Sequence, residues 1–217
     1  MDDLRHVEAG SLADAVEAWP VVEHDELARG WLFTFVRDRV TTPGGEVMTR
    51  EFVEHPGAVA VVALDAEERV VLVRQYRHPV RRLLYEIPAG LLDIGGEDYV
   101  TAAQRELAEE TGLAAGTWSV LVDLFTSPGV LGETLRVYLA RDLTPVGRPA
   151  GFELHGEEAE MEVCVARLDD LADAVLDGRL GNPALCTGVL AAVAARSRGW
   201  AGLRRVDAPW PGRGDRP

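Results

Sequence analysis

The sequence predicts an α+β protein in which a mixed sheet lies between helices in an α/β/α sandwich, with a small β-hairpin appended near the N-terminus. Three observations lead to this class. Strand-like segments occur along most of the chain, including the apolar run AVAVVAL at 58–64 and RVVLVRQYR at 69–77. Helix-like segments are few, at about 99–111, 168–178 and 182–199. A length of 217 residues, 47% of them hydrophobic, suits one ordinary domain with a small addition.

The N-terminal part is expected to form a leader followed by a hairpin. Residues 1–26 are acidic and weakly patterned, which indicates a loose leader or a short helix. Residues 30–40 alternate in a strand-like way, TTPGGE forms a turn, and VMTREFVEH continues as a second strand. Because an aromatic two-stranded hairpin is not stable alone in water, it must pack on something, and we expect a homodimer in which this region contacts the partner.

The domain boundaries follow from these segments. Residues 1–55 are predicted to form the leader and dimerisation hairpin, and residues 56–207 the main domain. In the main domain, Asn182 is placed to cap the last helix, with a proline directly after it. The stretch 208–217 is rich in proline and glycine and is predicted to be disordered.

The composition excludes several classes of partner. There are 36 acidic and 22 basic residues, and the net charge of −14 argues against nucleic acid or an anionic membrane as a main partner. Cys164 and Cys186 lie in apolar stretches and are expected to be buried free thiols. We found no signal peptide and no apolar run approaching the roughly 20 residues of a membrane helix. A cytoplasmic protein acting on a small molecule is therefore expected.

The helix predicted from about Tyr99 to Thr111, with Gly112 as its left-handed stop residue, carries an electrostatic conflict. Glu106, Glu109 and Glu110 stand near its C-terminus, where the helix dipole disfavours negative charge. Helical periodicity places two of these glutamates beside the buried stripe rather than on the far solvent face. A solvated acidic face is the ordinary explanation of such a run, but a bound divalent cation explains it better.

The same stretch resembles the Nudix box. The motif of that family begins with a glycine, which is followed by five residues of any type and a glutamate. Seven more residues of any type then lead to Arg-Glu-U-x-Glu-Glu-x-Gly-U, where U is aliphatic. Here Glu97 is followed by seven residues and then by RELAEETGL at 105–113. The first glycine departs from the pattern, since six residues rather than five separate Gly90 from Glu97. The two glycines at 95 and 96 make such a one-residue bulge easy.

The resemblance implies a hydrolase that uses Mg²⁺, or Mn²⁺, to cleave a pyrophosphate. Glu106 and Glu110 are then the leading metal ligands, and Glu109 is a further ligand or a contact of a second metal. Arg105 is expected to orient a glutamate. Possible additional ligands are the Ala89 carbonyl, Glu97, which alternatively only caps the loop, and Glu160.

Several features look like the ADP-ribose pyrophosphatase subfamily. These are QYRH at 75–78, EIPAGLLD at 86–93, and Pro128, fifteen residues beyond Leu113. In that subfamily HGEEAEMEV at 155–163 corresponds to a mobile catalytic loop. The expected general base is Glu158, with Glu157 as the fallback.

The same resemblance implies residues that contact the substrate. They are Arg50, Arg77, Glu133 and Pro128. The aromatic Trp31 and Phe33 are expected at an interface, with stacking on adenine as the less favoured role.

The expected reaction is hydrolysis of ADP-ribose, a nucleoside diphosphate sugar, to AMP and ribose 5-phosphate. Two alternatives stay open. The first is hydrolysis of another nucleotide sugar such as GDP-mannose, and the second is a non-catalytic ligand-sensing module with the same fold. Retention of all three glutamates of the box disfavours the second.

Overall fold

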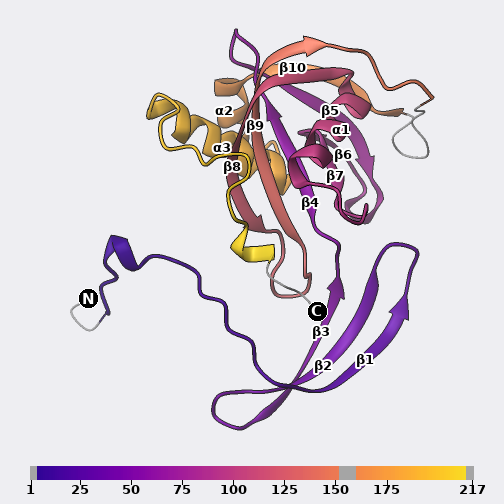
Figure 1. Cartoon of the computed structure of the whole chain (residues 1–217), viewed down its shortest axis with the longest axis vertical. Coiled ribbons are helices and arrows are strands. Elements are labelled where there is room, and N and C mark those ends of the chain that lie inside the picture. The colour runs from indigo at the N-terminus through magenta and orange to yellow at the C-terminus, as the bar shows by residue number, and fades with distance from the viewer. Residues whose placement is uncertain (1–3, 152–159, 214–217) are drawn as a thin grey trace. The chain divides into compact units, whose positions relative to one another are not determined.

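The computed structural model describes residues 4–151 and 160–213 and forms two compact units, Met1–Val53 and Glu54–Pro217 (Figure 1). The division follows from the sequence pattern, because polar strands make up the first unit and most of the apolar runs lie in the second.

The first unit contains a three-stranded sheet in the order β1-β2-β3, formed by Val21–Arg29, Thr34–Thr41 and Val47–Glu54. The expected hairpin corresponds to β2 and β3. The expectation of a loose or helical leader was wrong for residues 21–26, which belong to β1. This strand is mainly polar and is held to its neighbour by cross-strand polar contacts, including the His24–Asp38 hydrogen bond at 2.6 Å and the Glu23–Arg39 ion pair at 2.9 Å. The strand was missed in the sequence because its apolar and polar residues do not alternate regularly.

The first unit buries very little of its apolar surface. Among its described residues only Val36 is fully buried, while Trp31 is wholly exposed and Phe33 and Phe35 keep more than a third of their surface in solvent. Exposed aromatic side chains on a small sheet are costly in water. The expectation that this sheet packs on a second copy of the chain stays a prediction.

The second unit contains two sheets. The four-stranded sheet has the order β7-β4-β9-β8, in which β4 and β9 are parallel and the other neighbours antiparallel. The three-stranded sheet has the antiparallel order β10-β5-β6. The strands are β4 Ala58–Ala63, β5 Arg69–Arg77, β6 Arg82–Glu86, β7 Ala89–Leu91, β8 Leu113–Phe125, β9 Thr134–Pro145 and β10 Glu162–Arg167.

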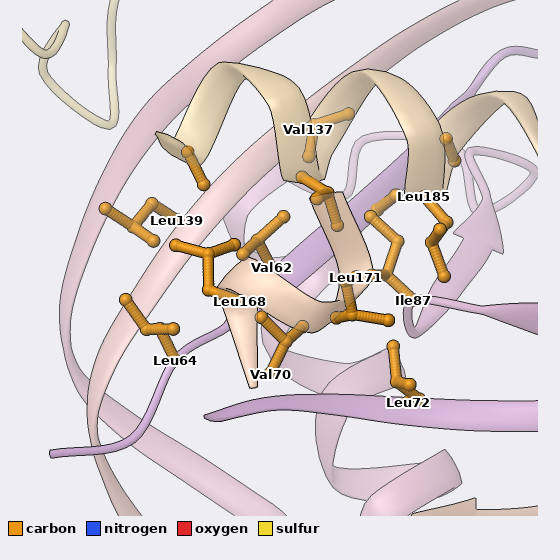
Figure 2. Close-up of a cluster of buried hydrophobic side chains, with 14 of the residues drawn as sticks. Val62, Leu64, Val70, Leu72, Ile87, Val137, Leu139, Leu168, Leu171 and Leu185 are labelled. Atoms are coloured by element: carbon orange, nitrogen blue, oxygen red, sulfur yellow. The ribbon is translucent and has the colours of Figure 1, made fainter. Parts of the chain in front are cut away.

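Helices cover β4 from both faces. The even-numbered residues of this strand, such as Val62, pack with Leu168 of α2 (Leu168–Leu176) and Leu185 of α3 (Pro183–Ser197), as Figure 2 shows. The odd-numbered residues, such as Val59, pack with Ala103 and other buried residues of α1 (Tyr99–Thr111). A continuous apolar strand is expected when both faces are covered. The predicted α+β sandwich is therefore confirmed.

Local predictions in the second unit have mixed outcomes. The cap of α3 is confirmed, because the Asn182 side chain accepts the Leu185 N–H at 2.9 Å. Cys164 and Cys186 are free thiols but only half-buried, and this burial raises the pKa of both.

The expectation of disorder from residue 208 was wrong for 208–213. In this stretch Trp210 is 8% exposed and a 3-10 turn follows at Pro211–Arg213. Within the described part of the chain, no helix is long and apolar enough to cross a membrane. The cytoplasmic location stays a prediction.

Candidate active site

Helix α1 lies where the sequence predicts it, from Tyr99 to Thr111. It ends at Gly112, which adopts a left-handed conformation with φ of 70° and donates its N–H to the Ala108 carbonyl at 2.9 Å. Ala102, Ala103 and Leu107 face the sheet and are fully buried. The buried stripe fixes the rotation of the helix and so determines where its glutamates lie.

Arg105 joins three acidic side chains. It donates to both carboxylate oxygens of Glu97 at 3.1 Å, to Glu106 at 2.6 Å and to Glu109 at 3.0 Å. All four side chains are largely shielded from solvent. The pKa of Arg105 is raised, first by its hydrogen bond to Glu97 and then by the charge of Glu106. A permanently charged guanidinium thus fixes the orientation of carboxylates that would otherwise repel one another.

Two glutamates of α1 converge on the short strand β7. The Oε2 atom of Glu110, a residue only 6% exposed, accepts the Ala89 N–H at 3.2 Å. Glu106 lies over Gly90 so closely that a Cβ added there would be 1.9 Å from its carboxylate carbon. Gly90 is therefore required by the position of Glu106, and the two carboxylates meet the backbone of adjacent residues.

The end of α1 receives a second compensating cation. Arg148 donates from Nε to the Glu109 carbonyl and from Nη2 to the Glu110 carbonyl, both at 3.0 Å. A cation at a helix C-terminus stabilises the negative end of the dipole. A bound cation is therefore not the only group that can offset the glutamates, because Arg105 and Arg148 each offset part of the charge. No local pattern indicated Arg148, which lies 38 residues beyond Glu110.

A buried acid near the site was not singled out from the sequence. Glu86, at the end of β6, is 2% exposed and accepts two hydrogen bonds from Arg77 at 2.8 and 2.9 Å, together with one from Gln75 at 3.4 Å. The buried carboxylate thus fixes the side chain of Arg77, a residue expected to contact substrate. The only sequence feature that could have indicated Glu86 is its place three residues before Ala89, as the first residue of EIPAGLLD at 86–93.

Glu133, another expected substrate contact, belongs to a polar cluster at the start of β9. It accepts from the Thr126 hydroxyl and lies 3.4 Å from Nε2 of His55. The other ring nitrogen of His55 accepts the Gly57 N–H at 2.9 Å, so a neutral ring carries its proton on the side of Glu133.

The other predicted site residues belong to connecting segments, to the first unit, or to the part of the chain outside the described residues. Pro128 is exposed in the turn between β8 and β9, and Glu160 is exposed just before β10. Arg50 belongs to β3 of the first unit and donates to the Thr49 carbonyl. Glu157 and Glu158 fall outside the described residues. The substrate and base assignments of these residues stay predictions.

The donor set suits a hard divalent cation. Among the described residues, no group of three or more His, Cys, Asp or Glu side chains is gathered for a metal ion. Two carboxylates and a backbone carbonyl are nevertheless sufficient for Mg²⁺, which usually keeps several waters and binds through one or two carboxylates. Glu106 and Glu110, whose carboxylates lie against Gly90 and Ala89 respectively, could supply the two carboxylates of such a set.

The fold and the glutamate helix together define the class of protein. The chain belongs to the NUDIX domain family, whose family model matches residues 54–183. The resemblance inferred from residues 97–113 is therefore confirmed.

Individual relatives extend this result. The chain is 48% identical over 189 residues to a Mycobacterium tuberculosis protein named ADP-ribose pyrophosphatase, covering 87% of this chain and 89% of the relative. It is 35% identical over 159 residues to a Bacillus methanolicus protein named methanol dehydrogenase activator, covering 73% and 84%. The crystal structure of an ADP compounds hydrolase has the same fold, with a TM-score of 0.70 at 21% identity, over 86% of this chain and 99% of that one.

Proposed function

We propose that this protein hydrolyses ADP-ribose with water to AMP and ribose 5-phosphate. The observation that carries the proposal is the 48% identity to the mycobacterial ADP-ribose pyrophosphatase across most of both chains. The glutamates of α1 are all present, which favours an enzyme over a ligand-sensing module.

Glu106, Glu110 and the Ala89 carbonyl would hold Mg²⁺, with Mn²⁺ as a substitute. A bound divalent cation neutralises pyrophosphate charge and acidifies the attacking water. In this proposal Arg105 fixes the orientation of the Glu97 and Glu109 carboxylates through its hydrogen bonds. Glu109 is also available as a metal ligand. Support comes from the convergence of Glu106 and Glu110 on β7.

Other residues would bind the substrate and activate the water. Arg77, held by Glu86, is suited to bidentate contact with a phosphate. Glu158 is the proposed general base, with Glu160 as its helper. Replacing a general base lowers kcat by about 10² to 10⁴-fold with little change in KM. We expect this loss of kcat in Glu158→Gln. If Glu157→Gln shows the loss instead and Glu158→Gln stays active, the base is Glu157.

We also propose that two copies associate through the first unit. Support comes from its exposed aromatic residues, Trp31, Phe33 and Phe35, on a sheet with almost no core of its own. The burial of such side chains is a common driving force for stable homodimers.

A substrate panel tests the proposed specificity. The kcat/KM values for ADP-ribose, GDP-mannose and other nucleoside diphosphate derivatives are measured with Mg²⁺ and again after chelation. We expect ADP-ribose to be preferred and chelation to abolish turnover. Cleavage of GDP-mannose with ADP-ribose left intact would contradict the assignment. The variant Glu110→Gln, assayed with the preferred substrate, identifies whether turnover comes from this site.

A further inference from the structure

The segment from Arg204 to Arg213, most of which falls in the stretch predicted to be disordered, is attached to the four-stranded sheet. Strand β8 has a register shift between Val120 and Val122, and Val120 donates its N–H to the Arg204 carbonyl at 3.0 Å. The Arg204 side chain donates to Asp123 of the same strand at 2.7 Å. The irregularity in β8 thus accompanies a backbone contact with the C-terminal segment.

A buried arginine connects the middle of this segment to β9. Arg136 is 1% exposed and binds both carboxylate oxygens of Asp123 at 2.7 and 3.0 Å. It also donates to the Ala208 carbonyl at 2.9 Å and to the Pro209 carbonyl at 3.0 Å. A buried guanidinium is tolerated only when its N–H groups have acceptors. Since the C-terminal segment supplies two acceptors, it is an integral part of the packed unit.

The end of the segment contacts the beginning of α1. The ring of Trp210 lies 4.8 Å from the Arg136 guanidinium carbon and stands perpendicular to the Tyr99 ring at 5.2 Å. Arg213 donates to the Tyr99 hydroxyl at 3.1 Å and to the Pro56 carbonyl at 2.6 Å. The two hydrogen bonds of Arg213 thus join three parts of the sequence that are more than 40 residues apart.

Tyr99 is the first residue of α1, and this end of the helix lacks ordinary capping. The Asp98 side chain makes no capping hydrogen bond, and the first turn contains no acidic residue. A cation such as Arg213 at a helix N-terminus opposes the dipole, so the Tyr99 ring and the Pro56 carbonyl account for its position. Packing by the C-terminal segment therefore takes the place of a cap, while Arg148 holds the other end of the helix.

We propose that the segment Arg204–Arg213 positions helix α1, with Trp210 and Arg213 acting as positioning residues for the carboxylates of Glu106 and Glu110. Loss of the Tyr99 contacts frees the first turn, and the helix then holds its glutamates less firmly against β7. The part of this inference that concerns metal binding rests on the proposed function. The part that concerns the order of α1 does not.

Hydrogen–deuterium exchange of the metal-free full-length protein tests the inference. Trp210→Ala is compared with Trp200→Ala. This matched control also removes a tryptophan–arginine contact, because the Trp200 ring lies 5.2 Å from the Arg141 guanidinium carbon, but Trp200 lies just beyond the end of α3 in the same unit. We expect Trp210→Ala to speed exchange of the amides at 102–107 by at least about tenfold through local opening, and Trp200→Ala to act only on α3. Unchanged exchange in α1, or a uniform rise over the whole unit, would overturn the proposal.

A milder variant and a second measurement keep the test independent of folding and of substrate. If Trp210→Ala does not fold, amide exchange in Arg213→Ala is judged by the same criteria. The conservative variant Trp210→Phe, which keeps an aromatic ring at this position, is expected to keep exchange in α1 slow. Mn²⁺ binding, followed by electron paramagnetic resonance, should weaken several-fold in Trp210→Ala and stay unchanged in Trp200→Ala. Equal affinities in the two variants would refute the positioning of the carboxylates. Failure of the wild type to bind Mn²⁺ would instead contradict the proposed function and leave the exchange result to decide the inference.

Discussion

Replacing Gly90 by alanine should damage the site far more than the fold. The added Cβ would lie 1.9 Å from the Glu106 carboxylate carbon, where ordinary contact begins at 3.4 Å. The carboxylate must therefore move by about 1.5 Å, and a misplacement of about 1 Å costs about 10²-fold in rate. Because only the end of a flexible side chain has to move, the stability cost is about 0.5–1.5 kcal/mol.

The assay compares Gly90→Ala with Gly95→Ala, whose Cβ would meet nothing within 4 Å. We expect kcat for Gly90→Ala to fall about 100-fold with weaker Mn²⁺ binding, while its Tm falls by less than about 6 °C. The Gly95→Ala variant should retain wild-type activity. Full activity in Gly90→Ala would show that the position of the Glu106 carboxylate does not matter, and the reasoning would then fail.

Three further predictions concern the glutamates of α1, the Glu86–Arg77 pair and the first unit. Glu106→Gln and Glu110→Gln should each lose most of the activity. The metal-free Tm of each variant should stay within a few degrees of the wild-type value, because removing negative charge from a helix C-terminus relieves repulsion. Unfolding of both variants would mean that these residues are structural. Glu86→Gln should raise KM several-fold. In a double-mutant cycle the same change should have no further effect on KM once Arg77 is replaced by alanine, whereas additive effects would mean that Glu86 does not act through Arg77. Deletion of residues 21–53 should convert dimers to monomers in sedimentation velocity, and a monomeric full-length protein at micromolar concentration would contradict this.

The sequence predicted those parts of the molecule that depend on local pattern. Helix α1 and its left-handed stop at Gly112 follow from short-range periodicity and glycine chemistry, and both were located correctly. The cap at Asn182 was predicted for the same reason. The i,i+4 contact of Arg105 with Glu109 also follows from helical spacing.

The features that sequence reasoning missed depend on contacts between distant segments. Strand β1 is specified by cross-strand polar contacts with β2, and its own residues resemble a solvated leader. Proline and glycine near the C-terminus indicate disorder by composition, but Arg136, about 70 residues earlier, supplies hydrogen bonds that order the segment. Arg148 illustrates the same limit at the site, because only the fold brings it to the end of α1.

The central claim is that the glutamates held at β7 serve Mg²⁺-dependent cleavage of ADP-ribose. The most direct test is chromatographic analysis of the products after ADP-ribose is incubated with the purified protein and Mg²⁺. We predict AMP and ribose 5-phosphate in equal amounts from the wild type, and a loss of at least about 100-fold in Glu110→Gln. Unreacted ADP-ribose, or equal product formation by the wild type and Glu110→Gln, would contradict the account.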